Sequence, residues 1–592
     1  MNVPRTIRIG GASGFWGDSQ IALPQLLGGG RLDYIAFDYL AEITMSILAR
    51  ARARDPALGY ATDFVELVGR HLPTIAAQSV KLLSNAGGLN PNACADALRR
   101  KIDDAGLSLR VGVVSGDDLL DRIADFRECR EMASGASLPE SLVSFNAYLG
   151  AFPVAAALDA GADIVITGRC VDSALALGAC IHAFGWAAND HDRLAGGSLA
   201  GHIIECGAQS TGGLFTDWET TGDWANIGYP IVEVAADGSF TVEKVDGTGG
   251  LVSRGTVAEQ LVYEIGDPHA YLLPDVVCDF TRVMIEETGP DRVSVTGARG
   301  RAPTGHYKAS ATWEDGFRVG ATWTVIGIDA TAKARRIADA VLRRVGAMLD
   351  ALGVVPFPET SVEVLGAESA YGTFARAEAA REVVLKIAAK HPNPKALELL
   401  VREFTSAGTS MAPGFTGMAG NRPKVMPVIR LFSPLVPKSR VPVTIDLNGT
   451  VETMAFAGHD HDDFALPVES VSTVSSGPDW SEVPLIRLAF ARSGDKGNAA
   501  NIGVIARDPA FLPYIRAALT PDSVALRFAH YEPRNVERFD LPGIAALNFV
   551  LRDVLGGGGV ASLRNDPQGK GYAQILLDAP IAVPPEIARM LP

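Results

Sequence analysis

The sequence has little of what marks membrane, secreted or nucleic-acid-binding proteins. No apolar run approaches 18 residues without a polar interruption, which argues against a membrane-spanning helix. None of the six cysteines stands in a C-x-x-C pair and no secretory leader pattern opens the chain, so we expect reduced thiols in the cytoplasm. Positive charge is also scarce. The net charge of −15 argues against wholesale binding to nucleic acid or an anionic membrane.

The first part of the chain alternates short apolar runs with helical patterns, up to about residue 225. The runs are Thr6–Ile9, Tyr34–Phe37, Val80–Leu83, Leu109–Val114 and Asp163–Thr167. This alternation predicts βα units around a parallel sheet, so the fold class is α/β. Whether the sheet is open or a closed barrel stays undecided at this point.

Residues 226–463 have a different character and predict a second, α+β lobe of the main domain 1–463. Strand-like alternation dominates there, with amphipathic helices expected at Thr331–Leu352 and Ala375–Ala389. Residues 464–484 carry few charges and several Ser, Val and Pro residues, which indicates a linker. A small unit, 485–592, is expected to open with a strand at Leu485.

Ligands of parallel α/β folds bind at the carboxyl ends of the strands, where this chain has unusual loops. The loop of residues 10–19 does not match G-x-G-x-x-G, which argues against a nicotinamide fold. Its Gly14, Asp18 and Ser19 could contact an anion at a helix N-terminus, or Asp18 or Ser19 could simply cap a helix beginning near Asp18. Gly87 and Gly88 allow either close approach of a ligand or a plain turn.

Two further loops carry ionisable side chains. Arg169, directly after a predicted buried strand, suits a substrate carboxylate or phosphate, and Asp172 suits a base. The alternative is a structural ion pair between Arg169 and Asp172 at a helix start. Glu205 suits a general acid or base before a glycine-rich loop. His202, Glu205 and Cys206 would share a helix face, but no second cluster supports a metal there, and Cys206 has no assigned base.

The run of residues 492–501 is unusually polar between two strand-like segments. Asp495 and Lys496 are candidate catalytic groups, and Asn498 and Asn501 are candidate substrate ligands that would close the site against the main domain. The alternative is a solvated hairpin loop. The run is not a P-loop, because Asn498 stands where that motif needs a hydroxyl.

Two weaker signals lie elsewhere. Residues 299–308 form a basic segment that could bind the phosphates of coenzyme A. The alternative is an ordinary solvent-exposed loop. Residues 459–463, His-Asp-His-Asp-Asp, look like a metal tract but fit an exposed turn. We therefore predict no metal.

Several of these segments resemble one protein family. The runs RSGDKGNAANIGV and 541–578 resemble the C-terminal ferredoxin-like domain of the acyclic terpene utilisation protein A (AtuA) family. The runs GGASGFWGDS, IAFDYLAEITM, TGRCVDSALALGA and ECGAQSTGG resemble its main domain. The resemblance covers nearly the whole chain. It implies breakdown of acyclic terpenoids or branched-chain acids through acyl-CoA intermediates.

Two hypotheses about function follow. The first is an enzyme acting on an acyl-CoA-type intermediate by hydratase or lyase chemistry, with no cofactor beyond the coenzyme A of the substrate. The alternative is a non-catalytic assembly or regulatory partner of an acyl-CoA carboxylase or hydratase, recognisable by a large exposed apolar face and ordinary pKa values in the loops. In either case we expect a homo-oligomer.

Overall fold

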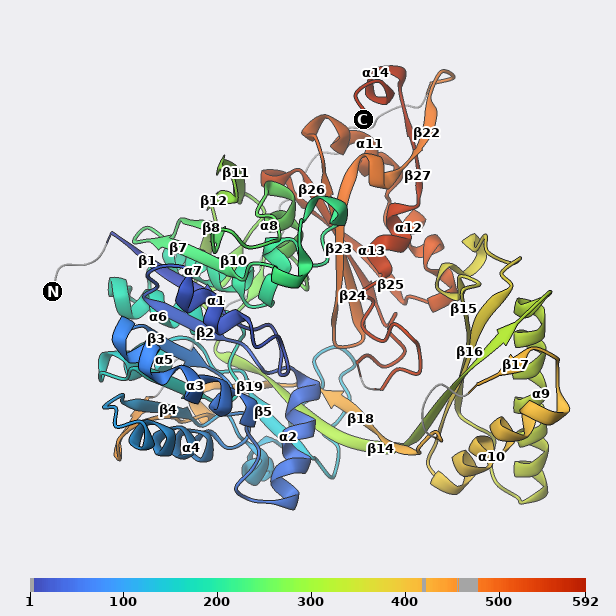
Figure 1. Ribbon diagram of the computed structural model, residues 1–592, viewed down its shortest axis with the longest axis horizontal. Helices are drawn as coiled ribbons and strands as arrows, with labels where there is room; N and C mark the ends of the chain where they lie inside the picture. Colours follow the sequence, from blue (N-terminus) through green and yellow to red (C-terminus); the bar gives the residue numbers. More distant parts are fainter. Residues whose placement is uncertain (1–4, 418–421, 455, 457–476, 560, 592) are drawn as a thin grey trace.

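One open sheet forms the core of the main body. The computed structural model describes residues 5–417, 422–454, 456, 477–559 and 561–591. The eleven strands lie at the left of Figure 1. In order across the sheet they are β11 (Met284–Gly289), β12 (Arg292–Thr296), β8 (Phe240–Lys244), β7 (Pro230–Ala235), β1 (Thr6–Gly11), β2 (Tyr34–Phe37), β3 (Lys81–Ser84), β6 (Ile164–Thr167), β4 (Val111–Ser115), β20 (Val443–Leu447) and β21 (Thr450–Met454).

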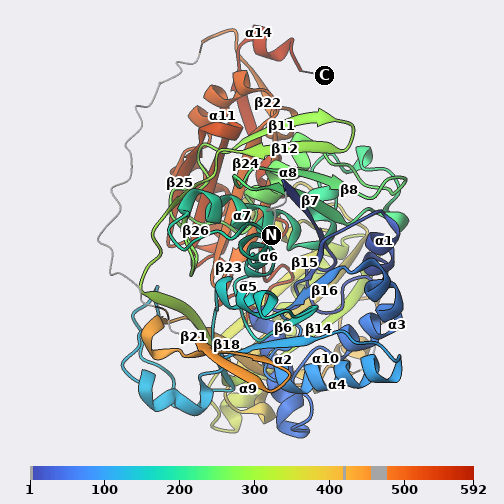
Figure 2. The same cartoon turned by 90° about the vertical axis from the view of Figure 1, so that its left-hand side faces the viewer.

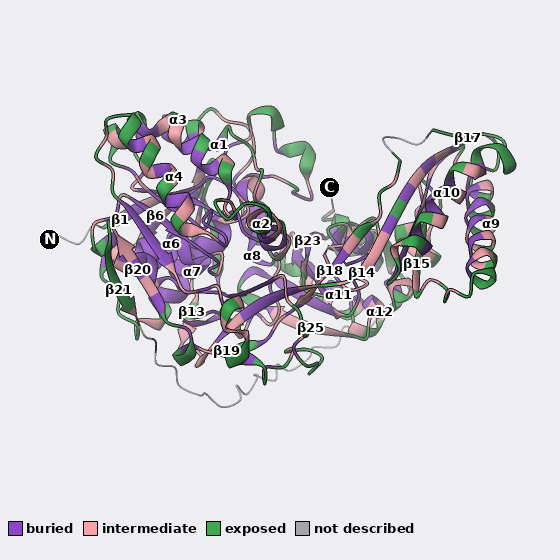
Figure 3. Cartoon of the chain, turned by 90° about the horizontal axis from the view of Figure 1, so that it is seen from below, coloured by how far each residue is buried: buried purple, intermediate pink, exposed green. Residues whose placement is uncertain are grey.

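The five central strands, β1, β2, β3, β6 and β4, run parallel, as the sequence predicted. Every residue of β2 and β6 is buried, which is typical of strands covered by helices on both faces. The helices of this part are α1 (Ala22–Gly28), α2 (Glu42–Arg54), α3 (Thr62–Gln78), α4 (Pro91–Asp104), α5 (Phe152–Asp159), α6 (Ala174–Phe184), α7 (His191–Ile204) and α8 (Arg254–Leu261). Nine residues of α6 and eleven of α7 are buried, so these helices are internal (Figure 3).

The change of pattern near residue 230 marks a change of strand direction within the same sheet. β7, β8, β12 and β11 extend one side of the parallel core with antiparallel strands, and β20 and β21 extend the other. Part of the α+β lobe predicted for 226–463 therefore belongs to the first sheet. Sequence alternation reveals a half-exposed strand but not the sheet that it joins.

The lobe itself is carried by the long strand β14 (His306–Ile326), which reaches from the main body to the right of Figure 1. β14 lies between β16 (Glu382–His391) and β17 (Phe415–Thr416), with β15 (Glu359–Leu365) on the outer edge. Nearer the body it pairs with β5 (Ser144–Ala147), β18 (Met426–Phe432) and β19 (Leu435–Pro437). Helices α9 (Ala330–Ala351) and α10 (Pro394–Ser410) cover this sheet, and their outer faces are exposed (Figure 3).

The helix predicted for Ala375–Ala389 is wrong. Residues 382–391 form β16, which pairs with β15 on one side and β14 on the other. The Ala, Lys and Glu content of this stretch favours a helix locally, but a strand between two partners satisfies its backbone and buries its alternate Val, Leu and Ile side chains. The helix predicted for Thr331–Leu352 is confirmed as α9.

The C-terminal unit contains a four-stranded antiparallel sheet in the order β23 (Ala489–Lys496), β24 (Ala499–Ala506), β26 (Ala546–Arg552) and β25 (Asn535–Leu541). Its helices are α11 (Leu512–Ala518), α12 (Pro521–Arg527), α13 (Tyr572–Leu577) and α14 (Pro585–Ala588). β22 (Ser481–Pro484) pairs with β27 (Pro580–Val583), so the end of the predicted linker belongs to this unit. Leu485 begins a 3-10 turn rather than a strand. Much of the expected linker lies outside the described residues.

The run 492–501 is not a long loop. It is mostly strand, because β23 and β24 pair from Ala489 with Ala506 to Lys496 with Ala499, leaving a turn of only Gly497 and Asn498. The remaining short strands are β9 (Tyr271–Leu272), β10 (Val277–Asp279) and β13 (Arg299–Arg301), which form a separate small sheet. The basic segment 299–308 is thus largely β13 and the start of β14, and Arg299 pairs with Asp192.

All six cysteines are unpaired. Within the part of the chain that the structure describes, no helix combines the length and apolar character needed to cross a bilayer.

The C-terminal unit packs tightly on the main body, beside the edge of the large sheet (Figure 2), and Gly543 donates a backbone hydrogen bond to Thr281. Two strand glycines allow this approach. A Cβ on Gly503 of β24 would lie 2.1 Å from Cγ2 of Val262, and one on Gly494 of β23 would lie 2.5 Å from Cγ of Glu264. At these two positions the hairpin therefore has no room for a side chain.

We expect Gly503→Ala to destabilise the protein by about 2 kcal/mol, because a β-branched neighbour cannot move away without a backbone shift. Thermal unfolding of the full chain measures this. Gly320→Ala is the matched control in β14, since its Cβ would lie 3.6 Å from Cβ of Ala388, an ordinary contact. An equal effect of both substitutions would contradict the close-packing argument.

Candidate active site

Side chains at the carboxyl ends of β1, β2 and β6 converge on one small pocket. It has a volume of about 10 Å³, enough for about one water molecule. Its lining residues are Ser13, Ala36, Asp38, Asp172, Leu175, Ala176, Gly201, Ile204 and Glu205. Three of these are carboxylic acids, which come from the end of β2, the start of α6 and the end of α7.

Asp38 follows β2 directly and is 7% exposed. Its Oδ1 accepts a hydrogen bond of 2.6 Å from Nδ2 of Asn85, which follows β3. Burial and the neighbouring carboxylate of Asp172 raise the pKa of Asp38 well above its usual range, although Arg169 and Asn85 oppose this. The surroundings of Asp38 therefore favour its protonated form more than water does.

Arg169 follows β6 and is 4% exposed. Its Nη1 donates to Oδ1 of Asp172 at 2.8 Å, and its guanidinium lies 4.1 Å from the ring centre of Tyr148. The carboxylate of Asp117 accepts a hydrogen bond of 2.8 Å from the backbone N–H of Arg169. Burial raises the pKa of Asp117 to about 7. The predicted pairing of Arg169 with Asp172 is present. Asp172 lines the pocket, whereas Arg169 supports it from outside.

Glu205 ends α7, and its side chain is 11% exposed. Its Oε1 lies 3.0 Å from Nδ1 of His202, one turn earlier. Burial raises the pKa of Glu205, and His202 works in the opposite direction. Burial strongly raises the pKa of the adjacent Cys206 thiol as well, which argues against a thiolate nucleophile at this position.

The hairpin of the C-terminal unit delivers Lys496 to the same region. Its Nζ lies 6.0 Å from the ring centre of Tyr271, and that ring lies 6.0 Å from the ring of His202. Lys496 is also among the charges that affect the pKa values of Glu205 and His202. The C-terminal hairpin and the strand-end loops therefore meet within one chain.

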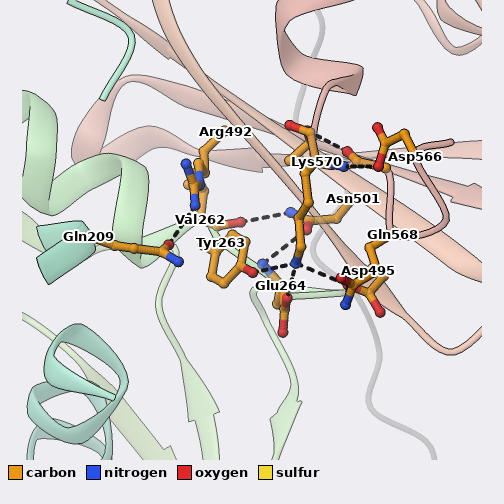
Figure 4. A network of polar contacts seen from close by, with 12 residues as sticks. Gln209, Val262, Tyr263, Glu264, Arg492, Asp495, Asn501, Asp566, Gln568 and Lys570 are labelled. Carbon is orange, nitrogen blue, oxygen red and sulfur yellow. Dashed lines mark hydrogen bonds and ion pairs between the residues drawn. The ribbon is translucent and has the colours of Figure 1, made fainter. Parts of the chain in front are cut away.

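Asp495 lies in a polar network between the two units (Figure 4). Lys570 is its centre: the Nζ lies 3.0 Å from Oδ1 of Asp495 and 2.7 Å from Oε1 of Glu264, and it donates to the hydroxyl of Tyr263. Gln568 also donates to Asp495, at 3.2 Å. Asp495 thus holds the units together next to Lys496, rather than lining the pocket.

The two predicted asparagines have structural partners. Asn501 donates to the Val262 carbonyl at 2.7 Å and accepts the Glu264 N–H at 3.0 Å, so it docks the hairpin on the body (Figure 4). Asn498 sits in the turn, where its amide donates to Asp553 at 3.1 Å and accepts from Gly557 at 2.8 Å. Neither lines the pocket.

The first predicted loop is held by its own side chains. Asp18 accepts the Gly14 N–H at 2.8 Å and the hydroxyl of Tyr229 at 2.8 Å, and a Cβ on Gly14 would lie 2.6 Å from the Cys206 carbonyl carbon. The expectation that Asp18 or Ser19 caps a helix beginning near Asp18 is wrong, because α1 begins at Ala22 without a side-chain cap. Ser19 is exposed.

Gly87 and Gly88 form a packed turn. A Cβ on Gly87 would lie 2.5 Å from the Thr167 oxygen, and Gly88 has a φ of +54° beside Leu48. Both glycines thus permit close contact between backbone segments at the strand ends.

No group of three His, Cys, Asp or Glu residues suits a metal ion in the described part of the chain, and residues 459–463 lie outside it.

Comparison with protein families agrees with this architecture. The model for the acyclic terpene utilisation family protein AtuA matches residues 7–447, and the model for the AtuA ferredoxin-like domain matches residues 483–582. The chain belongs to the AtuA family. The resemblance seen in the sequence motifs is thereby confirmed, and the C-terminal unit is the ferredoxin-like domain of the family. No curated protein and no solved structure matches the chain.

Sequence reasoning missed several groups that shape this AtuA-family site, namely Asp38, Asp117, Glu264 and Lys570. Asp38 was detectable, because a carboxylate directly after a buried parallel strand is as unusual as Arg169 two residues after β6. Lys570, between two glycines, gave only a weak signal. Glu264 gave none, since only the docking of the C-terminal domain brings it to a lysine.

Proposed function

We propose that this AtuA-family protein is an enzyme of acyclic terpenoid or branched-chain acid catabolism that hydrates an unsaturated acyl-CoA or catalyses the reverse elimination. The observation that carries the proposal is the water-sized pocket lined by Asp38, Asp172 and Glu205. A water in it would have Ser13 and three carboxyl groups as neighbours, which meets the need of a buried water for two to four polar partners.

Hydration requires one group that takes a proton from water and one that gives a proton to the substrate. Asp172, held by Arg169, serves as the base. Glu205, whose pKa burial raises, serves as the acid. Lys496 supplies positive charge for the enolate that forms at the thioester carbonyl. The non-catalytic alternative predicted ordinary pKa values in these loops, and the raised pKa values of Asp38 and Glu205 argue against it.

The test is incubation of the purified protein with terpenoid and short branched enoyl-CoA thioesters in ¹⁸O-labelled water, followed by mass spectrometry. The expected product has gained one labelled water. The same acids without coenzyme A are the control and are expected to remain unchanged. Absence of labelled product from every thioester, and of elimination from the matching 3-hydroxyacyl-CoAs, would refute the proposal.

A further inference from the structure

His202 and Glu205 form a buried pair. The hydrogen-bond partners of the two ring nitrogens determine how many protons the pair carries. His202 is 1% exposed in the last turn of α7. Its Nε2 lies 3.2 Å from the carbonyl oxygen of Leu261 in α8, and its Nδ1 lies 3.0 Å from Oε1 of Glu205. Gln260 fixes the backbone by donating to the His202 carbonyl at 2.9 Å. Both ring nitrogens therefore have a defined partner.

A carbonyl oxygen can only accept a hydrogen bond, so Nε2 of His202 carries a proton. The second contact, between Nδ1 and Oε1, also needs a proton, because two lone pairs at 3.0 Å would repel. That proton resides on either nitrogen or oxygen. In both cases the pair is neutral overall, as imidazolium with carboxylate or as imidazole with carboxylic acid.

We infer that His202 and Glu205 share one proton and act as a single acid–base unit, in which Glu205 faces the pocket and His202 is the positioning residue that keeps the proton available. The role in turnover rests on the proposed function, but the shared proton does not. In the acid step the Glu205 O–H bond breaks and a C–H bond to the substrate enolate forms. The carboxylate then remains beside a neutral imidazole that still carries its Nε2 proton.

The charged and titratable groups around the pair are Asp38 after β2, Asp172 before α6, Cys206 after α7, Lys496 on β23 and Tyr271 on β9. Burial alone would lower the pKa of His202, but the charge and hydrogen bond of Glu205 outweigh it, and the net direction is upward. Lys496 works against this rise. Glu205 raises the pKa of His202, and burial raises the pKa of Glu205, so both effects favour keeping one proton between the two side chains.

The test is a pH titration of the histidine ring nitrogens by NMR in the full chain labelled with ¹⁵N-histidine, with His202→Gln used to assign the signal. In the unmodified protein we expect the His202 ring to titrate above about 6.5, the usual histidine value. In Glu205→Gln we expect it to titrate below that value with Nε2 protonated, since the glutamine amide can donate to Nδ1. No substrate is required.

Asp159→Asn is the matched control, because it breaks the exposed pair of His182 and Asp159, 2.6 Å apart, and should leave the His202 signal unchanged. If Glu205→Gln fails to fold, Lys496→Met replaces it and should raise the His202 pKa. An unchanged His202 titration in the folded variant would overturn the inference. Expected titrations without any turnover of thioesters would support the proton pair and refute only the proposed reaction.

Discussion

Replacing Glu205 with glutamine is expected to lower turnover by about 100-fold or more while the protein stays folded. A positioned general acid contributes about 10²–10⁴ in rate, and glutamine has the same shape but no transferable acidic proton. Glu205 directly follows α7 and its side chain lines the pocket. Its replacement by glutamine therefore removes the acidic proton and leaves the packing of the side chain unchanged. Steady-state rates with the thioester found in the labelled-water assay measure the loss.

Glu66→Gln is a suitable control for this experiment. Glu66 lies on α3, its side chain is 64% exposed and it pairs with Lys101 on the surface. Its replacement should leave both turnover and melting temperature close to those of the unmodified protein. A Glu205→Gln enzyme with a rate within threefold of the unmodified enzyme would remove Glu205 from the mechanism.

Replacing Lys570 with methionine is expected to cost about 2 kcal/mol of stability and to loosen the ferredoxin-like domain. The substitution leaves Glu264 and Asp495 without their shared cation and the Tyr263 hydroxyl without its donor. An unsatisfied buried polar group costs about 1–3 kcal/mol, and the 38% exposure of the Lys570 side chain reduces the electrostatic part. Thermal unfolding and limited proteolysis of the full chain measure the two effects.

Turnover should fall in Lys570→Met as well, because Asp495 immediately precedes Lys496 in β23. Arg534→Met is the matched control, since it breaks an exposed pair with Asp553 in the same domain, where Arg534 is 59% exposed. Its effect should stay below about 1 kcal/mol. Equal proteolytic patterns for Lys570→Met and the unmodified protein would show that the network does not hold the domains together.

The pH dependence of this network has a defined sign. Burial works to raise the pKa of Glu264, but Lys570 and Lys496 outweigh it and lower the pKa. This contribution to stability is therefore present above about pH 4.3, the unfolded value, and is lost as pH falls through the lower folded value. The pKa of Lys570 is raised by Glu264, Tyr263 and Asp495 despite burial, so its contribution is present below about pH 10.4 and is lost only at higher pH. In Lys570→Met the acid side of the stability profile should become flatter.

The parallel core and its strand-end residues were predictable from local sequence. Strands such as β2 and β6 are short, continuous apolar runs, and the residues directly after such a run must lie at the sheet edge where ligands bind. This reasoning predicts Arg169 and Asp172, whereas Glu205 was predicted from its position before a glycine-rich loop at the end of a helical pattern. Asn498 and Asn501 were predicted as substrate ligands from the polar character of the run 492–501. Residue type alone does not separate a polar side chain that binds substrate from one that fixes a turn or docks a domain.

The sequence by itself determined the family, the alternation of strands and helices in the parallel core, and the polar character of the C-terminal hairpin. Each of these depends on neighbouring residues, through hydrophobic periodicity or a contiguous motif. Only the tertiary structure decided that Asp38, Asp172 and Glu205 share one pocket, that Lys570 meets Glu264, and that residues 382–391 form a strand. The physical reason is that charge pairing, burial and strand pairing act between segments far apart in the chain, so their energies have no local signature.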